Sequence, residues 1–301
     1  MRLDGVLFFP VTPFGPDGTV AGEVLAEHVA RGVAAGAGGV FTACGTGEFN
    51  ALDLDDYTEA VTASVAATAG RVPVFAGAGG TLPAARAVAR AAAANGADGL
   101  LLMPPYLVTA PAGGLVRYVL EVSEAGGLPV IIYQRGTARF SPAAVAELAQ
   151  APNVIGFKDG LGDFDLLQRI ILTVRQATDR PFTFFNGLPT AELTVPAYRG
   201  LGVRLYSSAA FAFAPEVALA FHRAVTGGDE ELTRRLLTGF FMPLVELRDL
   251  VPGYAVSLVK AGVRLRGLEV GGVRPPLLDP SPEHVARLEK IITAGLEIAV
   301  S

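Results

Sequence analysis

The sequence predicts a (β/α)8 barrel followed by a C-terminal helical region, and two observations lead to this fold class. Eight short apolar runs recur along the chain, each nearly continuous in apolar residues, as in parallel strands that are covered on both faces. The intervals between the runs carry helical patterns, so strand and helix alternate about every 20–35 residues. The alternative, an open doubly wound sheet, usually has fewer strands and a glycine-rich nucleotide-binding turn.

The expected strands are bounded by residue types that favour turns, mainly Gly, Pro, Asn and Asp. In chain order, we expect them within residues 5–12, 39–44, 72–78, 99–105, 128–134, 154–159, 182–187 and 203–208.

Several of the intervening helices have recognisable ends. The Ser-Pro pair that opens 141–150 is an N-cap followed by proline in the first turn. The stretch 53–70 opens with acidic residues, which favour the positive end of the helix dipole. The Ala-rich stretch 81–99 contains an Asn-Gly pair that indicates a helix C-terminus.

Beyond about residue 225 the strand pattern stops and only helical patterns follow. Amphipathic spacing predicts helices within 227–250, 254–267 and 281–300. We therefore divide the chain into a barrel, residues 1–225, and a helical region, residues 226–301, that packs on the barrel.

Composition excludes several classes of protein. Of the 301 residues, 51% are hydrophobic and 18% are charged, which excludes a disordered chain. The net charge of −5 gives no electrostatic footprint for nucleic acid or an anionic membrane. No apolar run is long enough to span a bilayer. We expect a cytoplasmic protein that acts on a small molecule.

Cysteine and histidine usage argues against a metal centre. Cys44 is the single cysteine, and the three histidines fall in three separate expected helices. The glycine-rich stretch 77–82 fails the dinucleotide-binding pattern, because leucine stands where its third glycine belongs. We expect neither a metal nor an organic cofactor.

Lys158 is the first candidate for chemistry. The chain has 3 lysines against 21 arginines, and this one ends the sixth expected strand. Alternation along the strand places Val154, Gly156 and Lys158 on one face, with Ile155 and Phe157 facing the helices. An amine at an apolar barrel mouth should have a lowered pKa and act as a nucleophile toward a carbonyl group. The alternative is a salt bridge, for example with Asp159.

Tyr133 and Arg135 end the fifth expected strand, next to Lys158. By the same alternation the phenol of Tyr133 points inward, where it could relay protons during imine chemistry. The alternative is a core tyrosine whose hydroxyl has a hydrogen-bond partner. Arg135 has the same parity and could bind a carboxylate at the rim, unless it lies in a solvated loop.

A glycine-rich loop, "CGTGEF" at 44–49, follows the second expected strand. Its glycines allow backbone N–H groups to approach an anion, and the hydroxyl of Thr46 adds a donor. Such turns are also common for geometric reasons alone. Glu48 is expected to stabilise this loop, because it stands where the next helix is entered.

Together these residues resemble a known family. "FPVTPF", "GTGE", "PPY", "IIYQR" and "GFKDG", each at or just after a different expected strand, resemble the class I aldolase superfamily of dihydrodipicolinate synthase and N-acetylneuraminate lyase. The stretch "VKAGVRLRGLEVGGVRPPL" at 259–277 resembles the family's C-terminal signature, so the likeness spans almost the whole chain. It implies a (β/α)8 barrel with a C-terminal helical region, assembled as a homodimer or homotetramer.

The resemblance also implies roles for individual residues. Lys158 would form a Schiff base, Tyr133 would assist proton transfer, and Gly45, Thr46 and Gly47 would hold the carboxylate beside the ketone. The chain departs from the synthase and lyase pattern, because Cys44 and Gly45 occupy the first two places of the usual Gly-Thr/Ser-Thr-Gly-Glu loop. The missing hydroxyl at position 45 argues against dihydrodipicolinate synthesis, and Gln134 replaces the expected asparagine, which leaves its role open.

Three further stretches, "GFKDGLGD", "FNGLPTAE" and "RLYSSAAFAFAPE", are similar to the members of this superfamily that dehydrate and decarboxylate a 2-keto-3-deoxy sugar diacid. The candidates for holding the distal carboxylate of that substrate are Arg135, Asn186, Thr190, Ser207 and Ser208. Two alternatives are a retro-aldol lyase or aldolase acting on a keto sugar acid or pyruvate, and a non-enzymatic protein that binds sugar acids.

Overall fold

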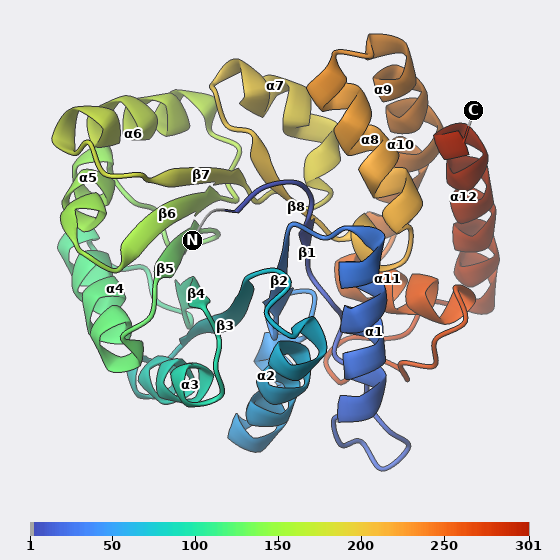
Figure 1. The fold of residues 1–301 in the computed structure, drawn as a ribbon, viewed down its shortest axis with the longest axis horizontal. Helices are drawn as coiled ribbons and strands as arrows, with labels where there is room; N and C mark the ends of the chain where they lie inside the picture. The colour runs from blue at the N-terminus through green and yellow to red at the C-terminus, as the bar shows by residue number, and fades with distance from the viewer. Residues whose placement is uncertain (1–2, 301) are drawn as a thin grey trace.

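The computed structural model describes residues 3–300, which form a closed barrel of eight parallel strands (Figure 1). The first strand pairs with both the second and the last, so the sheet closes on itself. The strands are β1 (Leu7–Phe8), β2 (Gly39–Thr42), β3 (Val74–Gly80), β4 (Gly99–Pro105), β5 (Val130–Gln134), β6 (Val154–Asp159), β7 (Thr183–Asn186) and β8 (Leu205–Ser208). The predicted fold class is confirmed. Seven of the strands lie within their expected segments, whereas β3 ends two residues beyond the expected 72–78.

A helix follows each strand and lies on the outside of the barrel (Figure 1). These helices are α1 (Gly22–Ala35), α2 (Leu54–Thr68), α3 (Leu82–Ala94), α4 (Ala112–Gly126), α5 (Pro142–Gln150), α6 (Phe164–Ala177), α7 (Val195–Gly200) and α8 (Pro215–Gly227). Short 3-10 turns lie in three of the loops: η1 (Phe49–Ala51), η2 (Ala191–Thr194) and η3 (Ala210–Ala212). The expected cap of α5 is present, because the Ser141 hydroxyl accepts a hydrogen bond from the Ala144 N–H at 3.2 Å.

The C-terminal region is helical, as expected. It consists of α9 (Glu230–Leu236), the π-helical segment η4 (Leu237–Phe241), α10 (Met242–Arg248), α11 (Tyr254–Leu265) and α12 (Pro282–Val300). One buried apolar cluster includes Tyr206 of β8 and Phe221 of α8 together with Phe240 and Leu258 of this region. Because α8 also runs through residue 225, the core continues across the expected boundary, and the division into two parts stays a prediction.

The π-helical segment interrupts a helix that otherwise runs from Glu230 to Arg248. Pro243, in the first turn of α10, explains it. Proline has no N–H to donate, and in a regular α-helix its ring would clash with the carbonyl four residues earlier, here that of Gly239. The wider π turn accommodates both effects. The segment therefore sets the direction in which Arg248, the last residue of α10, leaves the helix.

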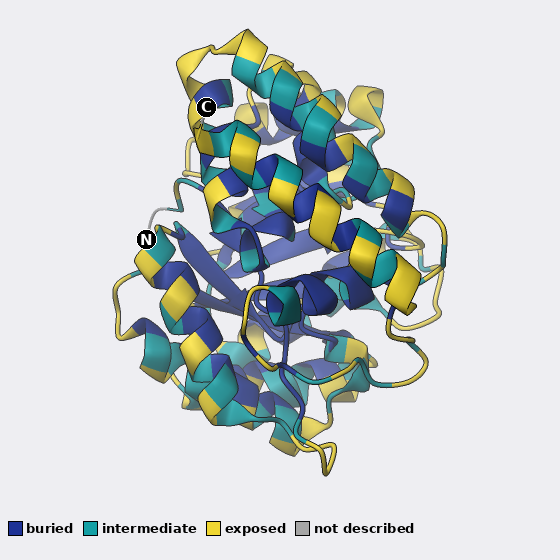
Figure 2. Cartoon of the chain, turned by 90° about the vertical axis from the view of Figure 1, so that its right-hand side faces the viewer, coloured by how far each residue is buried: buried dark blue, intermediate teal, exposed yellow. Residues whose placement is uncertain are grey.

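The interior of the barrel is filled with aromatic side chains. The rings of Phe9 and Phe41 stack with centroids 4.7 Å apart, and those of Phe41 and Phe75 stack at 5.0 Å. Figure 2 shows the strands buried in the middle of the molecule, with exposed residues confined largely to the outer faces of the helices. No helix among the described residues is long and apolar enough to cross a membrane.

The side-chain alternation expected for β6 is correct at Lys158 but wrong at the start of the strand. Val154 packs in the cluster between barrel and helices, whereas Ile155 packs against the cluster inside the barrel. The pairing of β5 with β6 shifts between Val130 and Ile131, and this irregularity reverses the faces of Val154 and Ile155.

Candidate active site

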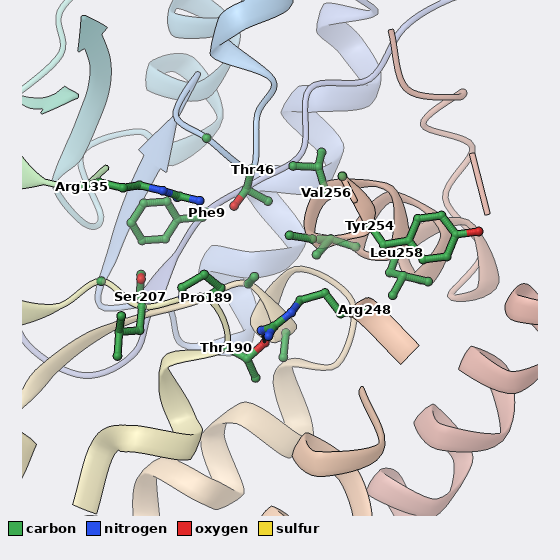
Figure 3. Close-up of a pocket in the computed structure, with 18 of the residues that line it drawn as sticks. Phe9, Thr46, Arg135, Pro189, Thr190, Ser207, Arg248, Tyr254, Val256 and Leu258 are labelled. Carbon is green, nitrogen blue, oxygen red and sulfur yellow. Dashed lines mark hydrogen bonds between the residues drawn. The ribbon is translucent and has the colours of Figure 1, made fainter. Parts of the chain in front are cut away.

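A cavity of about 460 Å³ opens at the C-terminal ends of the strands (Figure 3). Its walls come from the ends of β5 and β6, from the loops after β2, β7 and β8, and from α10 and α11. The lining includes three basic side chains, Arg135, Lys158 and Arg248, and no Asp or Glu. The cavity is therefore suited to an anionic ligand.

Lys158 reaches this cavity from the end of β6. Its Nζ lies 4.3 Å from the centroid of the Phe9 ring and 4.4 Å from that of Tyr133, and the residue is 4% exposed. Within residues 3–300 this amine forms no hydrogen bond and no ion pair. Burial, with a smaller contribution from the charge of Arg135, lowers the pKa of Lys158 to about 7, although Cys44 opposes the shift. A large fraction of the amine is therefore neutral at physiological pH.

Asp159 does not pair with Lys158, so the salt-bridge alternative is excluded. Its carboxylate lies on the opposite face of β6, where it accepts hydrogen bonds from Gln134 Nε2 at 3.2 Å and from the Tyr198 hydroxyl at 2.5 Å. The backbone N–H groups of the following loop also donate to it. Gln134 in turn accepts a hydrogen bond from the Phe140 N–H at 2.8 Å, so Gln134 has a structural role.

Tyr133 lies beside Lys158, because the two residues are partners in the register of β5 and β6. Its hydroxyl donates to the Gly187 carbonyl at 2.7 Å and accepts a hydrogen bond from Arg135 Nη1 at 3.3 Å. Burial raises the pKa of Tyr133, and the neighbouring charge of Arg135 opposes that shift. The free protein therefore presents a neutral phenol next to a partly neutral amine.

The glycine-rich loop after β2 contributes Gly45 and Thr46 to the cavity wall. A Cβ added to Gly45 would meet nothing within 4 Å, so the backbone here is open to a ligand. Gly47 does not line the cavity; its carbonyl accepts a hydrogen bond from the Thr12 hydroxyl at 2.7 Å. Thus only the first two of the three expected loop residues face the cavity.

Glu48 anchors this loop to the C-terminal region. Its Oε1 accepts from Lys260 Nζ at 2.7 Å, and its Oε2 accepts from the Arg274 N–H at 2.8 Å. Both side chains of the Lys260–Glu48 pair are fully buried. The arrangement agrees with the expected stabilising role of Glu48.

The remaining expected residues divide into two groups. Arg135, Thr190 and Ser207 line the cavity. Asn186 does not, because it stands in register with Asp159 and its side chain donates to the Ala191 carbonyl and the Thr194 hydroxyl outside the barrel. Ser208 likewise faces outward, where its hydroxyl donates to Glu192 at 2.5 Å.

These placements correct the sequence analysis for Asn186 and Ser208. Each residue ends a strand, but alternation turns its side chain away from the cavity, toward the surrounding helices and loops. The sequence alone did not reveal Arg248, because the signals used were strand ends, and this residue ends a helix of the C-terminal region.

A model of the dihydrodipicolinate synthetase family matches residues 2–295. The chain belongs to this family. The crystal structure of dihydrodipicolinate synthase from Bacillus clausii superimposes with a TM-score of 0.87 at 25% identity, over 97% of each chain. YagE, a prophage protein of the same family from E. coli K12, was solved in complex with pyruvate. It superimposes with a TM-score of 0.84 at 26% identity, over 96% of this chain and 98% of that one.

Other relatives are more similar in sequence. A probable 5-dehydro-4-deoxyglucarate dehydratase 1 of Streptomyces avermitilis is 58% identical over 97% of this chain and 93% of its own length. A protein of the same name in Streptomyces coelicolor is also 58% identical, over 97% of this chain and 92% of its own. A probable 5-dehydro-4-deoxyglucarate dehydratase of Azotobacter vinelandii is 42% identical over 96% of this chain and 94% of its own.

Proposed function

We propose that this protein is a decarboxylating dehydratase, which converts 5-dehydro-4-deoxy-D-glucarate to 2,5-dioxopentanoate, CO2 and water. The observation that carries the proposal is the amine of Lys158, buried in an anion-binding cavity without a carboxylate partner. Such an amine can attack a ketone and hold the product as an iminium ion. The names of the 58% identical relatives support the choice of substrate within the family.

The first step forms the imine. The neutral amine of Lys158 attacks C-5, the ketone carbon, and the resulting carbinolamine loses its hydroxyl group as water. The phenol of Tyr133, which faces the same space, supplies the proton that this water carries away. The phenolate that results lies beside the iminium cation and the guanidinium of Arg135, and both positive charges stabilise it.

The second step is the dehydration. The iminium group acidifies the C-4 methylene, and the phenolate of Tyr133 removes one of its protons to give an enamine. The enamine expels the C-3 hydroxyl, which takes a proton from Tyr133 and leaves as water. The product is an iminium ion conjugated with a carbon–carbon double bond.

The third step is the decarboxylation. The conjugated iminium accepts the electron pair of the bond between C-1 and C-2, and C-1 leaves as CO2. The dienamine takes up one proton at C-3 and one at C-4. The C-2 hydroxyl releases one of these protons, so C-2 becomes the aldehyde, and solvent water supplies the other. Hydrolysis of the iminium restores the C-5 ketone and releases Lys158.

The substrate also needs its C-6 carboxylate held beside the ketone. Gly45 and Thr46 line the cavity at the loop after β2, so their N–H groups and the Thr46 hydroxyl are our candidates for this contact. Ser207, at the end of β8, is a further polar group on the wall, available to a substrate hydroxyl.

The proposal includes assembly as a homodimer or homotetramer. The loop after β4 carries three large apolar residues that are strongly exposed: Tyr106 at 65%, Leu107 at 82% and Val108 at 51%. A contiguous apolar patch of this kind supports an interface between subunits. Light scattering should find more than one chain per particle, and a monomer would reject this part of the proposal.

The decisive experiment is incubation with 5-dehydro-4-deoxy-D-glucarate, with CO2 and 2,5-dioxopentanoate measured together. We expect equal amounts of both. Pyruvate with a three-carbon aldehyde acid would instead identify a retro-aldol lyase, and binding without turnover would identify a sugar-acid-binding protein.

Borohydride provides a second test of the mechanism. Reduction in the presence of substrate should leave a covalent adduct on the peptide that contains Lys158. Lys290→Ala removes an exposed lysine of α12 and should leave the adduct unchanged. An adduct on Lys260, or none at all, would reject the assignment of Lys158.

A further inference from the structure

The charge of the cavity suggests more than one contact for an anion. Lys158 is committed to the covalent chemistry, which leaves two guanidinium groups, those of Arg135 and Arg248, and no acidic side chain in the lining. A keto diacid brings a carboxylate beside its ketone and a second one at the far end of the carbon chain. The inference below rests on the proposed function, because it concerns that second carboxylate.

The two arginines stand at different places in the cavity. Figure 3 shows Arg135 beside Phe9 and Thr46, whereas Arg248 points at Thr190. Phe9 is in contact with the amine of Lys158, so Arg135 belongs to the reacting end. Arg248 belongs to the part of the wall formed by the loop after β7 and by the C-terminal helices.

Residues 187–190 form a continuous stretch of cavity wall between the surroundings of Lys158 and those of Arg248. Gly187 packs directly against the stem of Lys158, since a Cβ added there would lie 2.6 Å from its Cε. Thr190 follows three residues later, and three residues of chain span at most about 10 Å. Thr190 therefore lies within about 10 Å of Gly187, and the guanidinium bonded to it lines the same cavity as the reactive amine.

The environment of Arg248 favours a strong contact with a carboxylate. Its side chain is 18% exposed, whereas Arg135 is an exposed residue. The neighbouring wall is formed largely by apolar side chains, among them Phe213, Leu244 and Leu258. A charge-assisted hydrogen bond is stronger where solvent screens it less.

The hydrogen bonds of Arg248 leave donors for a ligand. Nε donates to Asp249 Oδ1 at 2.8 Å, and Nη1 donates to Thr190 Oγ1 at 2.9 Å. The hydrogens on Nη2 have no acceptor among residues 3–300. Because Thr190 Oγ1 accepts from Arg248, its own hydrogen remains available to an acceptor in the cavity. Guanidinium and hydroxyl thus offer two adjacent donors, which match the two oxygens of a carboxylate.

The backbone of Thr190 indicates that this position is constrained. Its φ is 51°, in the left-handed region that a β-branched residue rarely adopts. Such a conformation is unfavourable and is found where the surroundings hold a side chain in place, often at ligand sites. Here it holds the hydroxyl against Arg248.

We propose that Arg248, together with Thr190, binds the carboxylate farthest from the ketone and thereby selects keto diacids over keto monoacids. Arg248 is a specificity-determining residue in this proposal. It fixes the carboxylate that leaves as CO2, so that the bond to be broken can be aligned with the conjugated iminium.

The test compares two ligands that differ at one end. 2-Oxoadipate has the carbon skeleton of the substrate without its two hydroxyl groups, and 2-oxohexanoate replaces the distal carboxylate with a methyl group. Calorimetry should show that the wild type binds 2-oxoadipate more tightly. Arg248→Met should weaken that binding by roughly tenfold to a hundredfold, the effect expected for a lost charge-assisted hydrogen bond. Its affinity for 2-oxohexanoate should stay within about threefold of the wild-type value.

Three variants complete the comparison. Arg287→Met removes an arginine of α12 that pairs with Glu246 outside the cavity, and it should change neither affinity. Arg248→Lys should show part of the wild-type preference for 2-oxoadipate, because it keeps a positive charge but lacks the two parallel donors of the planar guanidinium. Thr190→Val removes only the hydroxyl and should weaken 2-oxoadipate binding by roughly threefold to tenfold; it also serves as the test if Arg248→Met does not fold.

The outcomes separate this inference from the proposed function. If Arg248→Met keeps the preference for 2-oxoadipate, or loses affinity for both ligands equally, Arg248 does not bind the distal carboxylate. Borohydride trapping of either keto acid on Lys158 of the wild type is a separate readout. Its absence would reject the Schiff-base mechanism, while the calorimetric preference would still decide the role of Arg248.

Discussion

Two buried lysines of this chain have opposite surroundings. Lys158 and Lys260 both lie against aromatic rings, with Nζ 4.3 Å from the centroid of Phe9 and 3.9 Å from that of Phe14, respectively. Lys260 forms a fully buried ion pair with Glu48 and donates to the Gly272 carbonyl at 2.7 Å. No such pair is formed by Lys158 within residues 3–300, and its pKa falls to about 7.

The difference shows that burial alone does not make an amine reactive. Burial lowers the pKa of Lys260 too, but the hydrogen bond and charge of Glu48 oppose that shift. At Lys158 the adjacent carboxylate of Asp159 is turned to the other face of the strand, so no carboxylate opposes the desolvation that lowers the pKa. Lys158 therefore has the surroundings that the proposed nucleophile requires, whereas Lys260 is held in an ion pair that joins two parts of the chain.

Replacing Lys158 should give the largest effect. Lys158→Met keeps the volume of the side chain and removes the amine, so we expect turnover to fall by roughly 10⁴-fold or more. Because the variant also loses a buried charge without a carboxylate partner, its stability should equal or exceed that of the wild type. Steady-state rates and chemical denaturation test both parts. A variant that retains activity, or that unfolds much more easily, would contradict the comparison.

Replacing Lys260 should give the opposite pattern. Lys260→Met leaves the carboxylate of Glu48 buried without its partner, so the free energy of unfolding should fall by about 3–5 kcal/mol. The folded fraction at low temperature should keep most of its activity, because Lys260 does not line the cavity. Urea denaturation and rates corrected for the folded fraction measure the two effects.

A double variant serves as the control for this prediction. In Lys260→Met combined with Glu48→Gln no charge of the pair is left buried, so part of the lost stability should return. If the single variant is as stable as the wild type, the pair is not the cross-link that the structure indicates.

The dependence on pH should be smaller and should follow Lys158. Only the neutral amine attacks the ketone, so kcat/KM should fall about tenfold for each pH unit below about 7 and level off above it. In stability, the folded state releases this proton near pH 7 and the unfolded chain near 10.5. Between these two pH values the unfolded chain binds one more proton than the folded protein. The free energy of unfolding should therefore rise as the pH rises from about 7 to 10.5.

Lys158→Met is also the reference for the pH effect on stability. The difference in free energy of unfolding between wild type and variant should shift in favour of the wild type as the pH rises from 7 to 10. No shift over this range would mean that Lys158 keeps an ordinary pKa in the folded protein.

Much of the barrel could be predicted from the sequence, because apolar runs report burial on both faces of a parallel strand. The inward direction of Lys158 and Tyr133 followed from alternation near the ends of β6 and β5, where the strands are regular. The same rule failed at Val154 and Ile155, because the register between β5 and β6 shifts there. A shift of this kind depends on neighbouring strands and leaves no pattern within one strand.

The rest of the site depends on contacts between distant parts of the chain. Asn186 and Ser208 end strands as expected, but their side chains form hydrogen bonds with residues after β7. The pattern of apolar residues within each strand does not predict where those partners lie. Glu48 meets Lys260 across 212 positions, and Arg248 meets Thr190 across 58. Neither contact can be recognised from the sequence around the residues that form it, because each residue stands in an ordinary helical or loop segment.

The number of residues in the π-helical segment before α10 determines which way Arg248 points. Each residue of an α-helix turns the chain by about 100°, so deleting one residue within Leu237–Phe241 would rotate everything that follows. Arg248 would then leave the cavity wall although no residue of the cavity had been replaced. Insertions and deletions in this segment are thus a route by which related enzymes, natural or designed, could change the acid they accept without any substitution in the site itself.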